Sequence, residues 1–267
     1  MNRIDSKFKE LKTLGRTAFI PYITAGDPDL KATGKLVMAL ERSGADIIEL
    51  GIPFSDPMAD GPTIQRAIKR SLDNGCTAKK VLALVKTLRK KVDVPIVFMT
   101  YFNIVFNYGV ERFVRDAKFC GADGLIIPDL PLEESAGISK CADKYEFRVI
   151  LLAAPTTPPD RFRRIAAGTG GFIYYVSLTG VTGARKVVPS TLKRDLDRLR
   201  KMTKIPLCAG FGISGKEQAS EIAPHADGVI IGSAIINIIE NNLSDQGRMF
   251  RRTERFSAGL AKAVHGA

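Results

Sequence analysis

The sequence predicts an α/β fold in which eight parallel strands close into a barrel inside a ring of helices, a (βα)8 or TIM barrel. Eight short apolar, often β-branched runs recur along the chain, and each precedes a segment with the 3.6-residue period of an amphipathic helix. No glycine-rich nucleotide-binding loop follows the first run, which disfavours the rival open, doubly wound sheet. No linker or low-complexity segment interrupts the chain, so we expect residues 1–267 to form one domain.

The strand candidates are apolar runs of four to eight residues. They are Thr17–Thr24, Asp46–Ile52, Pro95–Tyr101, Asp123–Pro128, Arg148–Ala153, Gly171–Ser177, Ile205–Ala209 and Gly228–Ile231. Strands that alternate with helices along a chain pair in parallel, and right-handed crossovers close eight of them into a barrel.

The helix candidates lie between these strands and after the last one. They are Leu30–Ser43, Ile64–Lys91, Val110–Phe119, Glu133–Lys144, Asp160–Ala167, Ser190–Met202, Gly215–Ile222, Ile235–Glu240 and Gln246–Ala263. The second stretch contains Asn74-Gly75, a turn signal, so we expect it to break into two helices there.

Composition narrows the functional classes. No run approaches the roughly 18 apolar residues of a membrane span, and the start of the chain lacks an apolar signal core, so a cytoplasmic protein without membrane contact is expected. The four cysteines form no C-x-x-C pair and are expected to be buried thiols. With two histidines, one of them near the end of the chain, a histidine-based metal site is excluded and no metal is expected.

The formal net charge of +12 raises the question of nucleic-acid binding. The basic residues are spread through the helix candidates with acidic residues among them, and no aromatic residues are interleaved with them in a basic tract. We therefore expect a solvated outer ring of helices rather than a nucleic-acid surface. The same charge is compatible with attraction of an anionic substrate.

The second strand contains the first candidate catalytic residue. Ile48, Leu50 and Ile52 share one face of the strand, whereas Glu49 shares the other with Ile47 and points into the barrel. An unpaired carboxylate is costly there, so a raised pKa and acid–base chemistry are expected. The alternative is a structural Glu that hydrogen-bonds to Ser or Tyr neighbours.

The loop after this strand, PFSDPMADGPTIQ, is rich in Pro, Gly and Asp. Active sites of such barrels lie at the carboxyl ends of the strands, so Asp60 is expected over the mouth, facing Glu49. The alternative is that Asp60 and Asp56 are turn residues and that Pro62 only starts a helix.

Two glycine-containing loops predict a phosphate site. Ala209–Ser214 follows the seventh strand, and Ile231–Ala234 follows the eighth just before a short helix. Backbone N–H groups at such positions bind anions, and barrels often bind phosphate with these two loops.

The sixth loop, Gly180–Arg185, has the composition of a mobile lid, with an inert loop as the alternative. No Lys lies within a strand or at its carboxyl end, which leaves a Schiff-base mechanism without a nucleophile.

These features resemble the tryptophan synthase alpha chain family. The matching segments follow one another in the expected order along nearly the whole chain. They are PYITAGDPD (Pro21–Asp29), IELGIPFSDPMADGPTIQ (Ile48–Gln65), MTYFNIVFNYG (Met99–Gly109), IIPDLPLEES (Ile126–Ser135), YYVSLTGVTGAR (Tyr174–Arg185), AGFGIS (Ala209–Ser214) and IIGSAI (Ile230–Ile235).

The resemblance implies retro-aldol cleavage of indole-3-glycerol phosphate to indole and glyceraldehyde 3-phosphate, without a cofactor. It makes Glu49 the general acid and base, and it makes Asp60 the residue that accepts a hydrogen bond from the indole N–H. The catalytic tyrosine of the family falls on Tyr174 rather than Tyr175, between which strand parity alone does not choose. Thr182 corresponds to the lid threonine that meets Asp60 on closure, and Leu178 stands where some relatives carry Arg.

The resemblance also implies the residues that bind the two ends of the substrate. The phosphate ligands would be Gly183, Gly212, Gly232 and Ser233. The indole pocket would comprise Tyr22, Ile64, Thr100, Ile126 and Phe211. Tyr22 and Thr100 replace the Phe and Leu of some relatives, which makes this pocket slightly more polar.

The implied partner is a tryptophan synthase beta subunit in an α2β2 heterotetramer, with pyridoxal phosphate only in the beta subunit. The expected interface comprises an exposed part of the loop after the second strand and two neighbouring segments, with Pro53, Phe54, Asp56, Asn103 and Asp129. Three alternatives stand beside this interpretation: a standalone indole-3-glycerol phosphate lyase, a phosphosugar isomerase, and a catalytically inactive barrel retained as a partner or a nucleic-acid binder.

Overall fold

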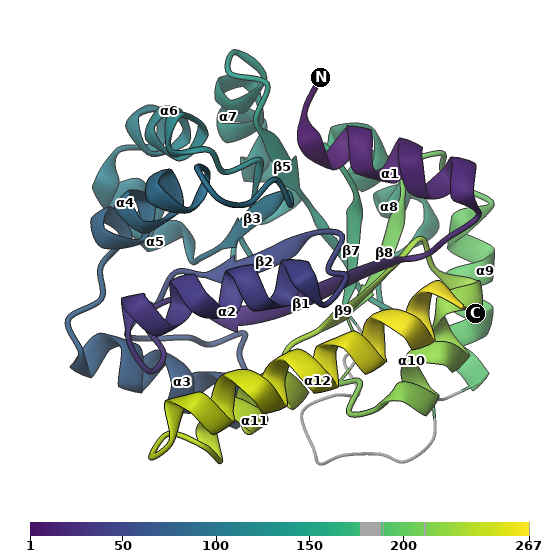
Figure 1. Ribbon diagram of the computed structural model, residues 1–267. Coiled ribbons are helices and arrows are strands. Elements are labelled where there is room, and N and C mark those ends of the chain that lie inside the picture. Colours follow the sequence, from purple (N-terminus) through teal and green to yellow (C-terminus); the bar gives the residue numbers. More distant parts are fainter. Residues whose placement is uncertain (177–187, 189, 211, 267) are drawn as a thin grey trace.

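The central sheet is a ring of parallel strands, surrounded by helices (Figure 1). The computed structural model describes residues 1–176, 188, 190–210 and 212–266. The strands are β1 (Ala18–Thr24), β2 (Ile48–Gly51), β3 (Ile96–Met99), β4 (Gly124–Ile126), β5 (Arg148–Ile150), β6 (Leu152–Ala153), β7 (Ile173–Val176), β8 (Leu207–Gly210) and β9 (Gly228–Ile231).

The order of the strands shows how the ring closes. Neighbours run β5-β4-β3-β2-β1-β9-β8-β7-β6, and each of these pairs is parallel. Only Leu151 separates β5 from β6, so these are two halves of one strand, the first pairing with β4 and the second with β7. Counted in this way, the described strands form the eight-stranded parallel barrel that the sequence predicts, and that fold class is confirmed.

The helices follow the predicted alternation, with two additions. They are α1 (Arg3–Leu14), α2 (Leu30–Arg42), α3 (Pro62–Asp73), α4 (Ala78–Leu88), α5 (Phe102–Tyr108), α6 (Val110–Cys120), α7 (Leu132–Asp143), α8 (Pro159–Gly168), α9 (Ser190–Arg200), α10 (Lys216–Ile222), α11 (Ser233–Glu240) and α12 (Gln246–His265). The expected break at Asn74-Gly75 separates α3 from α4, and Gly75 has the positive φ of 67° that favours glycine. Helix α1, of 12 residues, and the short helix α5, of 7 residues, are not among the sequence predictions.

The apolar core has two layers. Ile48, Leu50 and Ile52 belong to the outer cluster, where strands pack against helices. Ile47 belongs to a smaller cluster inside the barrel, together with residues of β1, β3, β4, β5, β8 and β9. The predicted alternation along β2 is therefore confirmed, and the face that carries Glu49 is the inner one.

Helix α1 closes the end of the barrel at which the strands begin. Ile4, Phe8 and Leu11 pack into the inner cluster. The Asn2 side-chain amide donates to the Asp123 carbonyl oxygen at 2.8 Å, and an Arg3 guanidinium nitrogen lies 2.9 Å from an Asp123 carboxylate oxygen. The carboxyl ends of the strands therefore form the open mouth.

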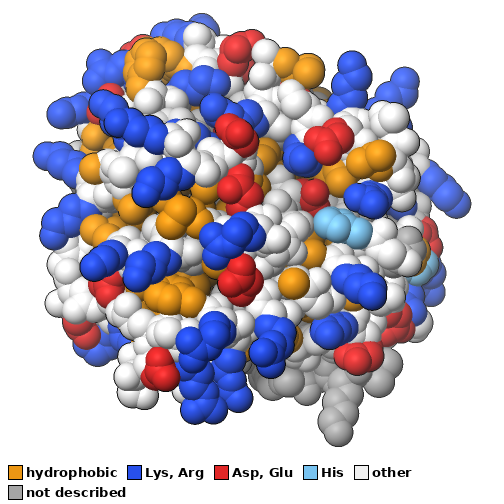
Figure 2. All heavy atoms as spheres, viewed as in Figure 1, with side chains coloured by type: hydrophobic (Ala, Val, Ile, Leu, Met, Phe, Trp, Pro, Cys, Tyr) orange, Lys and Arg blue, Asp and Glu red, His pale blue; other side chains and the backbone are white. Residues whose placement is uncertain are grey.

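The surface carries the predicted mixture of charges. Figure 2 shows Lys and Arg side chains scattered over one face, with acidic side chains among them. Within the described ranges, no helix combines the length and the apolarity needed to cross a membrane. All four cysteines are buried free thiols, as the sequence predicts.

Candidate active site

Glu49 is buried at the barrel mouth without a neutralising partner. Its side chain is 1% exposed, and neither carboxylate oxygen has a hydrogen-bond partner among the described residues. Burial, with a smaller contribution from the negative charge of Asp60, raises the pKa of Glu49 from 4.5 to about 8. The alternative of a structural Glu satisfied by Ser or Tyr neighbours is therefore wrong for the described part of the chain.

Asp60 lies at the same mouth, at the end of the loop after β2. Gly61 is the N-cap residue of α3 and Pro62 its first residue, so the carboxylate of Asp60 does not cap the helix. It instead accepts a hydrogen bond of 2.7 Å from the Tyr101 hydroxyl. Burial raises the pKa of Asp60, and the Tyr101 hydrogen bond opposes this rise. The backbone N–H of Asp60 donates to the Pro57 carbonyl oxygen at 3.1 Å, so Asp60 also closes a turn, as the alternative interpretation expects.

Tyr174 is the tyrosine that faces this pair of carboxyl groups. It contacts the inner cluster, and burial together with the charges of Glu49 and Asp60 raises its pKa well above the usual value. Tyr175 packs in the outer cluster. A Cβ at Gly210 would lie 2.5 Å from a ring carbon of Tyr174, so a glycine is needed where the ring crosses β8.

The predicted indole pocket is partly assembled around Glu49. Tyr22 pairs with Glu49 in the β1–β2 register, and its hydroxyl lies 3.2 Å from the Thr24 hydroxyl. A Cβ at Gly51 would lie 2.3 Å from the Tyr22 hydroxyl, so the phenol occupies the space that a side chain at position 51 would fill.

The other predicted pocket residues come from three further elements. Thr100 is buried just after β3, and its N–H donates to the carbonyl oxygen of Ile126 at 3.1 Å. Ile126 ends β4 within the inner cluster, and Ile64 is half-buried on α3. Phe211 lies outside the described residues.

The predicted phosphate ligands that can be placed come from the two expected loops. Gly232 is the N-cap residue of α11 and Ser233 its first residue, so the first-turn N–H groups, which have no acceptor within the helix, face this end. Gly232 also approaches Tyr22, whose ring would lie 3.2 Å from a Cβ at that position. Gly212 is exposed between β8 and α10. Gly183, like Leu178 and the lid residue Thr182, lies outside the described residues.

The predicted interface loop packs against its neighbours more closely than its composition indicates. Pro53 is buried, so the expectation that it is exposed is wrong; it continues the run of buried residues that begins in β2. The Phe54 ring packs against Tyr101 with centroids 5.2 Å apart. Asp56 is exposed, with its carboxylate 2.5 Å from the Ser55 hydroxyl.

The neighbouring segments present exposed residues, as expected. Asn103 and Asp129 are exposed, and Asp129 accepts a hydrogen bond of 2.9 Å from the N–H of Phe102. Two large apolar side chains on these surfaces are also exposed, Met58 at 86% in the loop after β2 and Phe106 at 65% on α5.

Tyr101 is the site residue that sequence reasoning missed. It is 3% exposed, donates to Asp60 and accepts a hydrogen bond of 2.9 Å from the N–H of Ala59. The only signal in the sequence was its position at the carboxyl end of a predicted strand, where site residues are expected.

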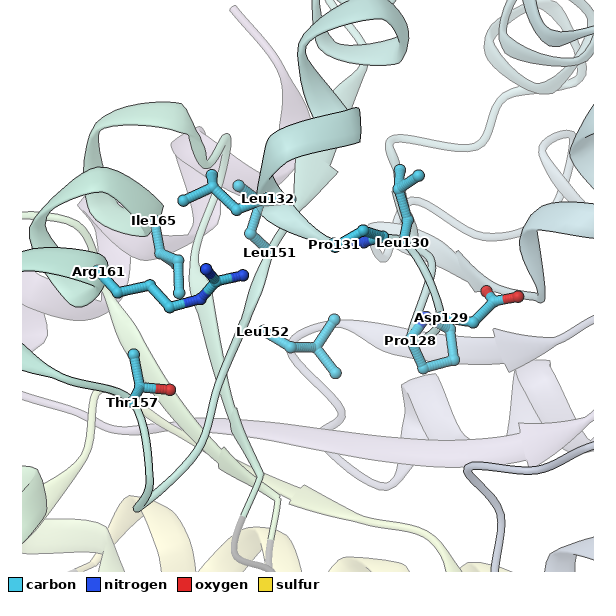
Figure 3. A pocket seen from close by; sticks show the side chains of 10 residues that line it. All are labelled: Pro128, Asp129, Leu130, Pro131, Leu132, Leu151, Leu152, Thr157, Arg161 and Ile165. Atoms are coloured by element: carbon cyan, nitrogen blue, oxygen red, sulfur yellow. The ribbon is translucent and has the colours of Figure 1, made fainter.

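A cavity of about 400 Å³ opens beside the mouth, between the segment after β4 and α8. Figure 3 shows Leu152 of β6 and the Arg161 guanidinium of α8 directed toward it. Because Leu152 pairs with Tyr174 in the β6–β7 register and contacts the inner cluster, the cavity borders the candidate site.

Comparisons with known proteins identify a family. The model of the family described as tryptophan synthase alpha chain matches residues 8–265. The chain is 47% identical to the tryptophan synthase alpha chain of Caldanaerobacter subterraneus, over 99% of this chain and 100% of that protein. It is 48% identical to the alpha chain of Geotalea uraniireducens, over the full length of both.

Solved structures give the same result. The crystal structure of tryptophan synthase subunit alpha from Legionella pneumophila superimposes with a TM-score of 0.93 at 39% identity, covering 99% of this chain and 98% of that chain. A chain of the tryptophan synthase complex from Pyrococcus furiosus superimposes with a TM-score of 0.84 at 36% identity, covering 92% and 98%.

Proposed function

The chain belongs to the tryptophan synthase alpha chain family, and from this membership we propose that Glu49, Asp60 and Tyr174 perform its reaction. That reaction, a lyase step of tryptophan biosynthesis, cleaves indole-3-glycerol phosphate to indole and glyceraldehyde 3-phosphate. The observation that supports the assignment is the buried carboxyl group of Glu49, which has no hydrogen-bond partner among the described residues and faces Asp60 at the open end of the barrel.

Glu49 is suited to move protons in both directions. With a pKa of about 8 it is mostly protonated at neutral pH, so it can donate a proton to indole C3. The resulting carboxylate then accepts the proton of the glycerol hydroxyl next to the ring. The bond between C3 and the glycerol carbon breaks, its electron pair restores the indole, and the hydroxyl carbon becomes the aldehyde. One proton is consumed and one released, which regenerates the acid.

Asp60 stabilises the charge that protonation creates. Once C3 is protonated, the positive charge spreads to the indole nitrogen, and a carboxylate that accepts the N–H lowers the energy of that state. The Tyr101 hydrogen bond favours the ionised form of Asp60. Tyr174, whose phenol is held neutral by burial and by the two carboxyl groups, can donate a hydrogen bond to the substrate or to Glu49.

Binding of the remaining substrate groups follows from the elements around this pair. The first turn of α11, at Gly232 and Ser233, offers N–H groups to the phosphate, and Gly212 offers another from the loop after β8. The apolar and hydroxyl-bearing side chains of Tyr22, Thr100 and Ile126 can enclose the indole. By the resemblance, Gly183, Phe211 and the lid residue Thr182 complete these contacts.

The partner of the chain is a tryptophan synthase beta subunit, as for the family, and this membership favours the α-subunit role over the standalone lyase. We propose that the loop after β2, α5 and Asp129 form the interface. The exposed apolar side chains of Met58 and Phe106 support this choice.

Because Glu49 and Asp60 supply the acid–base chemistry, the alpha reaction needs no cofactor, and pyridoxal phosphate is assigned to the beta subunit alone.

A cytoplasmic location is also proposed. It is supported by the biosynthetic role of the family, whose substrate is a phosphorylated metabolite. Fractionation of the producing cells, with detection of the chain by antibody, tests it; recovery in the membrane or secreted fraction would contradict it.

The catalytic assignment is tested by replacing Glu49 with Gln, which keeps the shape and removes the acid. A proton-transfer group contributes about 10²–10⁴ in rate, so kcat for indole release should fall by at least a hundredfold in the folded variant. Glu111→Gln, a substitution of an exposed carboxyl, is the matched control and should keep the wild-type kcat. A folded Glu49→Gln enzyme with more than a tenth of the wild-type kcat would remove Glu49 from this role.

A further inference from the structure

A network of four charged side chains connects the turn after β1 with helices α3 and α11, both of which begin at the barrel mouth. Arg70 donates from Nε and Nη2 to the two carboxylate oxygens of Asp27, at 2.8 and 2.9 Å, and from Nη1 to Oε1 of Glu240 at 2.7 Å. Arg66 donates to both oxygens of Glu240, each at 2.8 Å. We call Asp27, Arg66, Arg70 and Glu240 the Arg70 network.

The network is partly buried, and two hydrogen bonds from Arg70 to its most buried carboxyl group, that of Asp27, oppose the rise in pKa that burial causes there. The side chain of Asp27 is 0% exposed, and those of Arg70 and Glu240 are 22% and 23% exposed. Hydrogen bonds from Arg66 and Arg70 lower the pKa of Glu240 to about 2, so this carboxylate is ionised at neutral pH. Ion pairs held away from water are screened less by salt than surface pairs, so this network can fix geometry.

Each member of the network belongs to an element that begins or ends at the mouth. Asp27 lies in the turn after β1, Arg70 lies on α3, which begins two residues after Asp60, and Glu240 is the last residue of α11. The first residue of α11 is Ser233, in the proposed phosphate site. A second contact joins α3 to the β1 turn, because the Ser71 hydroxyl donates to the Ala25 carbonyl oxygen at 2.5 Å.

The arrangement requires an arginine at position 70. Only a planar guanidinium can bind both oxygens of one carboxylate while it donates a further hydrogen bond to another. A lysine would keep the charge but would reach one carboxylate at a time. Arg70 lies eight residues after Pro62, about 12 Å along the helix, so a small tilt of α3 at this position displaces its beginning, where Asp60 is attached.

We propose that Arg70 is a positioning residue that fixes Asp60 relative to the bound phosphate by joining α3 to the β1 turn and to the end of α11. This inference rests on the proposed roles of Asp60 and of the α11 N-terminus. Misplacement of a catalytic group by about 1 Å lowers the rate by as much as about 10². Weakening the network should therefore lower kcat and leave phosphate affinity nearly intact.

The test is a double-mutant cycle on the complex with the beta subunit, measured as indole release from indole-3-glycerol phosphate. Arg70→Lys should lower kcat by about tenfold, while the Kd of glycerol 3-phosphate, measured by calorimetry, changes by less than about threefold. In an Asp60→Asn background, Arg70→Lys should cause no further loss, because Arg70 acts through the Asp60 carboxylate. Glu254→Gln, which breaks the inter-helix ion pair of Arg42 and Glu254 outside the mouth, is the control and should be neutral.

The possible outcomes are distinct. Equal losses from Arg70→Lys in both backgrounds, or a loss confined to KM and to glycerol 3-phosphate affinity, would overturn the positioning role. Glu240→Gln, which leaves the Arg70–Asp27 pair in place, provides a second cycle if Arg70→Lys does not fold, and the same pattern with a smaller loss is expected. An Asp60→Asn enzyme that retains more than a tenth of wild-type kcat would instead contradict the proposed role of Asp60 itself.

Discussion

Glu49 is a residue whose chemistry opposes the stability of the fold. A carboxyl group with no hydrogen-bond partner in a buried site is costly to ionise, and this cost is what keeps it protonated near neutral pH. The same burial therefore raises the pKa for catalysis and lowers the free energy of unfolding, as is common where an active site is strained or unsatisfied.

The pH dependence of the free energy of unfolding tests whether the burial of Glu49 destabilises the fold. In the unfolded chain Glu49 ionises near 4.5, whereas in the folded chain it ionises near 8. Its stabilising contribution is therefore complete below pH 4.5 and is lost as the pH rises to 8. The Gln side chain does not ionise, so Glu49→Gln removes this loss. The free energy of unfolding of the variant minus that of wild type should therefore increase by on the order of 3 kcal/mol as the pH rises from 5 to 8.

Urea unfolding at pH 5, 7 and 9 measures this difference. Glu111→Gln, at an exposed position, is the comparison and should show no comparable trend. A difference between Glu49→Gln and wild type that stays constant over this range would mean that Glu49 ionises alike in both states, and its raised pKa would be wrong.

Single residues could be predicted from the sequence where a local pattern fixed their direction. The alternation of Ile47, Glu49 and Gly51 against Ile48 and Leu50 was enough to direct the carboxyl group inward. The alternation of residues along the strand did not choose between Tyr174 and Tyr175, because the residues on both of its faces are apolar. The family resemblance pointed to Tyr174. In the structure, the charge of Glu49 acts on Tyr174, whereas Tyr175 packs in the outer cluster.

At the scale of elements, the loop after β2 is held by the residue just before α5 as well as by its own turns. Tyr101, the N-cap residue of α5, receives a hydrogen bond from Ala59 and donates one to Asp60, and its ring packs on Phe54. A movement of α5 is therefore transmitted directly to the proposed catalytic carboxylate.

Tyr101→Phe should reveal this connection. Loss of the hydroxyl removes a hydrogen bond that lowers the pKa of Asp60, so that pKa should rise further. Because Asp60 acts in its ionised form, the acidic limb of the pH profile of kcat/KM should move to higher pH. The hydrogen bond is worth about 1–1.5 kcal/mol, so the acidic limb should move up by about one pH unit, and kcat/KM at a fixed pH on that limb should fall roughly five- to tenfold.

Tyr108→Phe is the matched control, because it removes a hydrogen bond of 2.9 Å from a tyrosine to Asp116 on the same side of the barrel but outside the mouth. It should leave the profile in place. If Tyr101→Phe lowers the rate without moving the acidic limb, the hydroxyl holds the loop without tuning Asp60.

Elements were predictable where a strand and the helix after it repeated along the chain. Helix α1 was missed because it precedes the first strand and so lies outside this alternation, and α5 was missed because it is short. The eight strands and the outer helices follow from repeated patterns, but α5 spans only Phe102–Tyr108, too few residues for a helical period to be distinguished. Tyr101 was missed because its partners are 41 and 42 residues away in the sequence. The burial of Pro53 was missed because a proline-rich composition resembles that of an exposed loop.

At the scale of the whole molecule, one surface joins the proposed interface to the catalytic loop. Asp56 is exposed on the loop that ends at Asp60, and this loop packs on Tyr101. Binding of a beta subunit to this surface should favour the active arrangement and raise the rate of indole release. Such coupling is typically about 1–3 kcal/mol, which corresponds to roughly 5–150-fold.

A titration with the beta subunit measures this activation directly. Asp56→Ala should reduce the activation at saturating beta subunit, while the slow activity of the isolated chain stays within about twofold of wild type, because a surface substitution changes little else. Asp73→Ala, on an exposed position of α3, is the control for loss of a surface carboxylate. If the beta subunit changes neither the rate nor the sedimentation of the chain, the interface assignment fails.

The helix that closes the far end of the barrel has a consequence for the order of events during synthesis. Helix α1 is synthesised before most of the strands against which it packs, because its N-cap residue and its side chains contact Asp123, Glu146, Arg148 and Phe172, more than 100 residues later. Until that later part of the chain has been made, most of the inner cluster that covers the apolar face of α1 does not exist. Helix α1 is therefore made before most of the barrel but can dock only when the barrel is nearly complete.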